Sequence, residues 1–163
     1  MKQLRKPTQA IGGLPAYVAA LEQKLQQFGA DPQATTAFII CLGEEYAAIR
    51  LGDLRSPWRF LKQVAGEPPV VFNASGFRSD LAENANDNVA RHYTAFLFVG
   101  YWLPVGLAVP LLWAWEVLGF LRYRLHWSQQ DMRSGWLGIQ HGRAVRKTGA
   151  SILPGLIIRD LKE

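Results

Sequence analysis

The feature that most constrains the fold is a long uncharged segment near the middle of the chain. Residues 93–115 contain no Asp, Glu, Lys or Arg over 23 positions, and about 20 apolar residues are enough for a helix to cross a bilayer. Pro104 and Pro110 lie inside this segment, and proline ends or kinks a helix because it lacks a backbone donor. We therefore predict two shorter helices joined near residues 103–106 and buried as a hairpin, with a single membrane span over 93–115 as the alternative.

Amphipathic segments on either side of this apolar segment support the buried hairpin. Residues 15–28 and 150–162 carry apolar side chains at helical spacing, and such stripes need an apolar partner. A chain of 163 residues, of which 49% are hydrophobic, is long enough for one core. We predict a mainly α, compact helical domain around a central apolar helical hairpin over residues 14–163, preceded by a flexible basic tail at 1–13.

Three further segments have local signals. Asp31 and Pro32 can begin a helix, but the branched and aromatic residues that follow also predict a small β-hairpin at 35–51, so both alternatives stay open. Ser56 and Pro57 begin a predicted short helix that Gly66 ends. Residues 73–88 are rich in Asn, Asp, Ser and Gly, which predicts a polar surface loop that leads to the first turn of a central helix.

Regularly spaced glycines mark the helix that follows the apolar segment. Asp131 is the predicted cap of a helix over residues 132–148. Within it, Gly135, Gly138 and Gly142 lie on one stripe. Each glycine inside a helix costs about 1 kcal/mol relative to alanine, so a row of them indicates that another backbone approaches closely. We predict tight helix packing here rather than a phosphate-binding loop, because no strand precedes the glycines.

The excess positive charge is confined to the last third of the chain. Residues 1–116 contain ten basic and ten acidic residues, whereas residues 117–163 contain eight basic and three acidic ones. This distribution fits a solvated helix face, or a surface for an anionic partner such as nucleic acid, an anionic membrane or an acidic protein. No nucleic-acid module signature accompanies it. The candidate binding residues are Arg91, Arg122, Arg124, Arg143, Arg146 and Lys147.

Several short polar motifs follow one another in the second half of the chain. They are AspAsnValAlaArgHis at 87–92, Glu116 at the end of the apolar segment, AspMet at 131–132, and the glycines 138 and 142. This pattern resembles an uncharacterised bacterial helical domain family, some members of which are toxin-like proteins. The resemblance covers residues 87–145, about a third of the chain. It differs at Ser134 and Gly135, where asparagines are usual. The resemblance implies no established activity.

Three of these polar residues form the candidate catalytic site. His92, Glu116 and Asp131 come from three consecutive helical segments, and if they converge they can bind a metal ion or form an acid and base pair. A purely structural network that fixes helix register explains the same residues, because buried polar groups must be paired whether or not they react. The sequence leaves the metal open and predicts no other cofactor.

The remaining polar residues argue against other kinds of site. Cys41 has no second cysteine to pair with, and neither it nor Ser151 has a neighbouring base, so a serine or cysteine nucleophile is not supported. His126 and His141 lie among basic residues, which predicts surface positions or contacts with an anion rather than a metal site.

Two functions of different classes remain. The first is a non-enzymatic helical binding protein that uses the basic last third of the chain. The alternative is a small hydrolase-like or effector-like domain that uses His92, Glu116 and Asp131. The single cysteine implies no oxidising compartment, which predicts a cytoplasmic location, with the membrane as the alternative.

Overall fold

The computed structural model describes residues 10–29, 31–52, 68–122 and 128–163, and within these ranges the chain is helical without a β-sheet. The predicted mainly α fold is therefore confirmed. The α-helices are α1 (Leu14–Phe28), α2 (Pro32–Tyr46), α4 (Val89–Trp102), α5 (Val105–Arg122), α6 (Gln129–Thr148) and α7 (Leu153–Leu161). Two short 3-10 helices, η2 (Ser79–Leu81) and η3 (Ala150–Ile152), precede α4 and α7.

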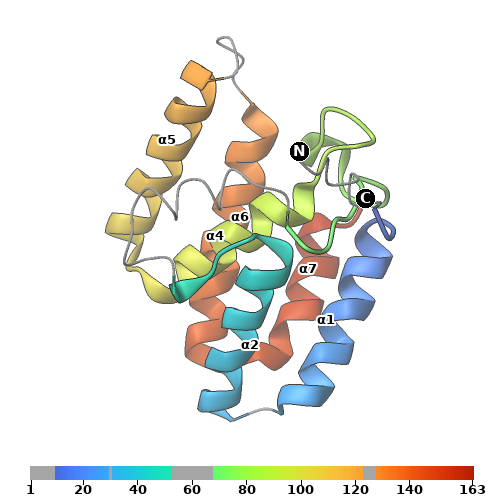
Figure 1. Cartoon of the computed structure of the whole chain (residues 1–163), viewed down its shortest axis with the longest axis vertical. Coiled ribbons are helices and arrows are strands. Elements are labelled where there is room, and N and C mark those ends of the chain that lie inside the picture. Colours follow the sequence, from blue (N-terminus) through green and yellow to red (C-terminus); the bar gives the residue numbers. More distant parts are fainter. Residues whose placement is uncertain (1–9, 30, 53–67, 123–127) are drawn as a thin grey trace, which may run out of the picture.

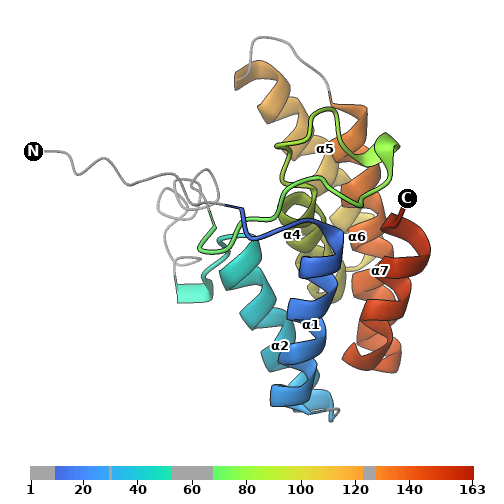
Figure 2. The ribbon, with the colours of Figure 1, turned by 90° about the vertical axis from the view of Figure 1, so that its right-hand side faces the viewer.

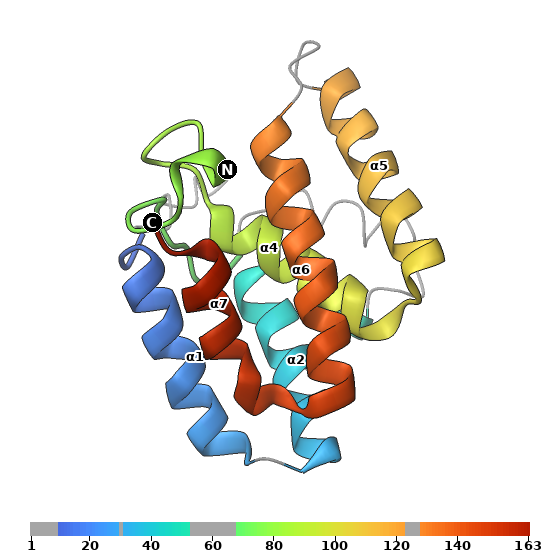
Figure 3. The same cartoon turned by 180° about the vertical axis from the view of Figure 1, so that it is seen from behind.

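The helices surround α4, which crosses the middle of the molecule (Figure 1). Helices α1, α2 and α7 lie together at one end, as the side view also shows (Figure 2). From behind, α6 runs along α4 and continues toward α7, while α5 forms an outer column beside α6 (Figure 3). The main core gathers side chains from α1, α2, α4, α6 and α7, and a smaller apolar cluster joins α5 to α4 and α6.

The central apolar segment forms two helices. Helix α4 ends at Trp102, Leu103 takes an extended conformation, and α5 begins at Val105 after Pro104. The predicted break near residues 103–106 is confirmed, and its cause is the proline. Pro110 lies inside α5 without ending it. Among the described residues, no helix has both the length and the apolar character needed to cross a membrane.

The alternative of a β-hairpin at 35–51 is wrong, because most of this segment belongs to α2. The Oδ1 atom of Asp31 accepts a hydrogen bond of 2.8 Å from the backbone N–H of Ala34, and Pro32 occupies the first helical turn. Phe38, Leu42 and Tyr46 are then buried on one face at helical spacing. Burial of this face outweighs the β preference of the branched residues, which is a weak and context-dependent preference.

Two glycines of the predicted row, Gly138 and Gly142, lie against the backbone of α4, whereas Gly135 lies against side chains. A Cβ atom added at Gly138 would lie 2.5 Å from the carbonyl oxygen of Tyr93, and one at Gly142 would collide with the carbonyl of Leu97. Gly100 of α4 meets the backbone of α6 in the same way. Glycines on both helices therefore set the close spacing between α4 and α6.

Two predicted segments fall partly or wholly outside the described residues. These are the basic tail, of which residues 1–9 are not described, and the short helix at 56–66. Residues 11–14 hydrogen-bond to residues 71–75. The polar segment at 73–88 does lead to the first turn of α4, where the side chain of Asn88 accepts a hydrogen bond of 3.0 Å from the backbone N–H of Arg91.

Candidate metal centre

Helices α4, α5 and α6 bring His92, Glu116 and Asp131 together. One candidate ligand atom from each side chain lies within 4.8 Å of the other two. The Nε2 atom of His92 is 3.3 Å from Oε1 of Glu116. Two packing features produce this convergence: the cap at Asn88 places His92 in the first turn of α4, and the stripe of α5 that faces the protein ends at Glu116.

Asp131 reaches the cluster from the first turn of α6, but it is not the cap of that helix. The cap is Ser128, whose Oγ accepts a hydrogen bond of 3.1 Å from the backbone N–H of Asp131. The helix therefore begins at Gln129, earlier than predicted. Because Ser128 performs the capping, the carboxylate of Asp131 can face His92 and Glu116. The Oγ of the fully buried Ser134 donates to the Asp131 carbonyl at 3.1 Å and holds this turn in place.

The Nε2 atom of His92 is buried without a hydrogen-bond partner among the described residues. The His92 side chain is only 14% exposed, and that of Glu116 only 8%. A buried polar atom without a partner costs about 1–3 kcal/mol, so native proteins rarely contain one unless it has a role. Gly135 packs closely against this atom, because a Cβ there would lie 3.0 Å from Nε2 and 2.6 Å from Cδ1 of Leu112.

Burial and neighbouring charges shape the titration of the cluster. Burial lowers the pKa of His92 below its ordinary value, and Arg91 lowers it further, whereas the charge of Asp131 and a backbone hydrogen bond with Asp131 oppose this shift. Burial raises the pKa of Glu116 from 4.5 to about 7, and the charge of Asp131 adds to this shift. Burial therefore disfavours the charged forms of both His92 and Glu116.

This arrangement is suited to a cation. The Nε2 atom of His92 lies 3.3 Å from Oε1 of Glu116 without a hydrogen bond to it. In the tautomer that carries its proton on Nδ1, Nε2 presents a lone pair toward Glu116. A lone pair that faces a carboxylate is repelled unless a proton or a metal ion lies between the two groups.

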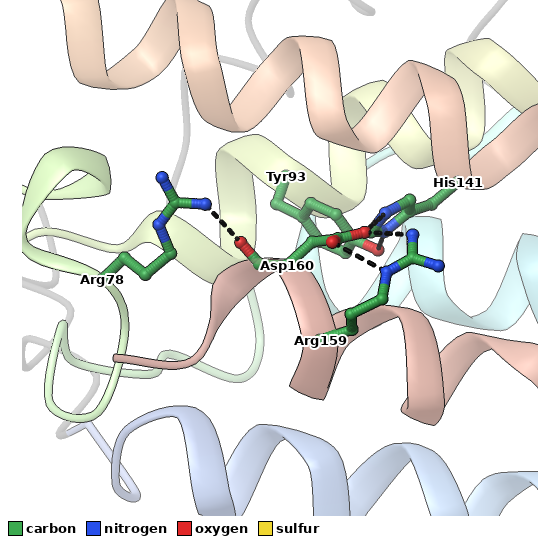
Figure 4. Close-up of polar contacts among 5 residues, drawn as sticks. All are labelled: Arg78, Tyr93, His141, Arg159 and Asp160. Atoms are coloured by element: carbon green, nitrogen blue, oxygen red, sulfur yellow. Dashed lines mark hydrogen bonds and ion pairs between the residues drawn. The ribbon is translucent and has the colours of Figure 1, made fainter.

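A second buried histidine lies in a cluster that the sequence did not predict (Figure 4). The Nδ1 atom of His141 is 2.7 Å from the hydroxyl of Tyr93, and its Nε2 atom is 2.8 Å from Oδ2 of Asp160. His141 is only 3% exposed, so a surface position is wrong, whereas its contact with the Asp160 carboxylate matches the alternative of an anion contact. The physical reason is its place on the glycine face of α6, one residue before Gly142. His126 lies outside the described residues.

Charged groups on α7 and before η2 complete this cluster. Arg159 donates to Asp160 at 2.8 Å, and Arg78 donates to the Asp160 carbonyl at 3.1 Å. The Arg159 side chain holds the pKa of Asp160 at about 2, well below 3.8. Burial lowers the pKa of His141, and Asp160 opposes that shift. Both ring nitrogens of His141 have hydrogen-bond partners. This cluster is therefore a structural network of the kind that was also considered for His92.

Three of the six predicted basic binding residues lie together on α6, and the other three lie elsewhere. Arg143, Arg146 and Lys147 are exposed on α6 and line a cavity of about 330 Å³ together with Leu103 and Pro104. Arg91 lies on α4 next to His92. Of the remaining two candidates, Arg122 ends α5 and Arg124 lies outside the described residues.

Comparison with known proteins gives no relative from which a function could be proposed, because no family model, curated protein or solved structure matches the chain.

Proposed function

We propose that the chain is a divalent-metal-binding helical domain, with Nε2 of His92 and the carboxylates of Glu116 and Asp131 as the ligands. The observation that carries this proposal is the buried Nε2 atom without a hydrogen-bond partner, 3.3 Å from Oε1 of Glu116, in a cluster whose ligand atoms lie within 4.8 Å of one another. A bound cation would give Nε2 its missing partner. It would also offset the free-energy cost of burying the charged Glu116 carboxylate.

The spacing of the cluster fits a transition-metal ion. In a tetrahedral site with ligands about 2.1 Å from the ion, the ligand atoms lie about 3.4 Å apart. The His92 and Glu116 atoms already have this separation, at 3.3 Å. Asp131 is partly exposed, and its ligand oxygen lies within 4.8 Å of the other two ligand atoms.

The donor set indicates which ions to test. Imidazole suits Zn²⁺ and Fe²⁺, whereas carboxylates also suit Mn²⁺. One nitrogen and two carboxylate ligands therefore favour Zn²⁺ or Mn²⁺ over Ca²⁺, which takes oxygen ligands. The polar pattern at residues 87–145, which resembles that of the bacterial helical domain family, includes all three residues. We propose that this pattern reflects the ligand set.

Isothermal titration calorimetry on chelator-stripped protein tests the proposal. We expect one Zn²⁺ or Mn²⁺ ion per chain, and we expect His92→Leu and Glu116→Gln to weaken binding more than about a hundredfold, which exceeds the usual effect of residues that only support ligands. Asp80→Asn is the matched control, because Asp80 is a carboxylate that pairs with Arg78 and Arg133 away from the cluster. Wild-type protein that takes up no ion, or equal affinity in all four proteins, would overturn the proposal.

A hydrolase-like use of the same site is a second candidate. Three protein ligands leave one position of a tetrahedral ion for water, which is the arrangement of catalytic rather than structural zinc sites. A metal ion in such a position supplies a water of lowered pKa. Substitution with Co²⁺ tests this candidate: azide should change the visible spectrum of the loaded protein if a coordination position is open, and an unchanged spectrum would favour a closed, structural site.

A further inference from the structure

The outer face of α5 is apolar, which distinguishes it from the solvent faces of the other helices. Its large side chains are 43% to 59% exposed, and they are Leu107, Leu111, Trp113, Val117 and Leu118. The face that packs on the protein consists of Ala108, Leu112 and Glu116 at a spacing of four residues. An acidic side chain therefore points inward on a helix whose outward face is apolar, the reverse of an ordinary surface helix.

Two other helices show what an ordinary solvent face looks like in this chain. The exposed positions of α1 include Glu22, Gln23, Gln26 and Gln27, and those of α6 include Arg133, Gln140 and Arg143. Single exposed apolar residues are normal, but a contiguous apolar face marks a surface that meets another apolar phase. The outer face of α5 extends over most of a helix about 27 Å long, since each of its 18 residues adds 1.5 Å.

Basic side chains lie where α5 begins. Arg143, Arg146 and Lys147 share a cavity with Leu103 and Pro104, the residues that connect α4 to α5, and none of the described residues that line it is acidic. A guanidinium N–H of Arg146 donates to the carbonyl oxygens of Tyr101 and Trp102 at 3.3 Å, which fixes this basic group against the turn. The Trp102 side chain, 42% exposed, lies at the same end of α5.

We propose that this surface docks the protein on an anionic membrane, with the outer face of α5 lying in the interface and the basic cluster facing lipid phosphates. Peripheral helices bind membranes through one apolar face combined with Lys and Arg that attract anionic lipids. Tryptophan is enriched at this depth because its ring is apolar and its N–H is polar, and Trp102 and Trp113 are both exposed here. Charge complementarity favours anionic lipid over a second copy of the chain, which would bring two basic clusters near each other.

Co-sedimentation of the full chain with vesicles tests this proposal. One set of vesicles contains phosphatidylcholine alone and the other also contains phosphatidylserine. We expect the protein to pellet with the phosphatidylserine vesicles and to be released by salt, which screens surface charges. Two pairs of substitutions dissect the surface: Leu107→Ser with Leu111→Ser should weaken binding at least about tenfold, and Arg143→Gln with Lys147→Gln should remove the preference for phosphatidylserine.

Matched controls lie on other exposed positions. Ile158→Ser removes an apolar side chain that is 46% exposed on α7, and Arg133→Gln removes a basic one on α6. Both controls should bind vesicles as the wild-type chain does, and circular dichroism should show that all variants keep their helices. A wild-type chain that stays in the supernatant, or serine variants that bind undiminished, would overturn the proposal. A dimer in sedimentation velocity that Leu111→Ser dissociates, without vesicle binding, would assign the face to a second copy instead.

Discussion

The contact between α4 and α6 has two halves. Each half contains a glycine of α6 near a buried histidine, but the two halves differ in packing and in hydrogen bonding. In the half around Gly138 and Gly142, the two backbones touch and His141 has a partner on each ring nitrogen. In the half around Gly135, the glycine faces side chains rather than the backbone of α4, and the Nε2 atom of His92 beside it has no hydrogen-bond partner among the described residues. We call these the closed half and the open half. The two halves therefore differ in whether the nitrogens of the buried histidine have hydrogen-bond partners, and we expect substitutions to affect them differently.

The largest effect is expected where the closed half has no spare volume. Gly138→Leu places a side chain against the Tyr93 carbonyl, 2.5 Å from the position of a new Cβ, and should lower the free energy of unfolding by about 3 kcal/mol or more, despite the better helix propensity of leucine. Gly135→Ala should cost less than about 1 kcal/mol, because its closest contact is the movable end of the Leu112 side chain. Urea unfolding measures both. Equal losses would mean that the two halves do not differ in packing.

Replacing each histidine with leucine, which has a similar volume, sharpens the same comparison. His141→Leu removes the partner of the buried Tyr93 hydroxyl and of Asp160, and should lower the free energy of unfolding by about 2 kcal/mol. His92→Leu should change it by less than about 1 kcal/mol in metal-free protein, because no hydrogen bond of Nε2 is lost. A larger loss for His92→Leu would assign the open half a purely structural role.

The carboxyl groups of the two halves should respond to pH with opposite signs. The pKa of Glu116 is raised from 4.5 to about 7, so in metal-free protein the native state is progressively destabilised as pH rises through this range. Glu116→Gln should therefore gain stability relative to wild type between about pH 4.5 and 7. The pKa of Asp160 is lowered from 3.8 to about 2, so its contribution is present above 3.8 and lost as pH falls toward 2.

Unfolding curves recorded in a chelator at several pH values measure both trends. The penalty of Asp160→Asn should shrink as pH falls from about 4 to 2, where the wild-type carboxylate also becomes protonated. Parallel pH profiles for wild type and Glu116→Gln would contradict the burial of Glu116.

The helices with strong periodicity could be predicted from the sequence. The choice between helix and strand in segments with mixed signals could not. The stripe of α1 and the break at Pro104 depend on neighbours a few residues apart, so the sequence contains them directly. The segment at 35–51 was ambiguous because Thr35, Thr36, Ile39 and Ile40 favour strands locally. The burial that decides for a helix comes mainly from α4, which is distant in sequence, and also from the preceding helix α1.

The candidate site was predictable in its members but not in its state. Polar residues next to long apolar segments have few places to lie except against one another, which is why His92, Glu116 and Asp131 could be grouped. Whether Nε2 of His92 has a hydrogen-bond partner depends on side-chain geometry, which cannot be predicted from the spacing of residues along the chain. The cluster of Tyr93, His141 and Asp160 was missed because Arg143 and Arg146 suggested a solvated segment. The signal that could have found it is the position of His141 on the glycine stripe.

The smallest and most local effect concerns Gly135. Gly135→Ala adds a methyl group 3.0 Å from the His92 Nε2 atom, which crowds the nitrogen of the proposed site, and should weaken Zn²⁺ binding with little change in stability. Calorimetry beside the unfolding measurement separates the two effects. Unchanged affinity would mean that the ion approaches from another side or does not bind at this cluster.

The most direct test of the open half is an anomalous difference map from crystals of the chain grown with Zn²⁺ and recorded at the zinc absorption edge. The account predicts a single strong peak between His92, Glu116 and Asp131, about 2.0–2.2 Å from Nε2 and from one oxygen of each carboxylate. The same map should show no peak at His141, whose ring nitrogens are already bonded to Tyr93 and Asp160. A map without a peak at His92, or with its strongest peak at His141, would contradict the account.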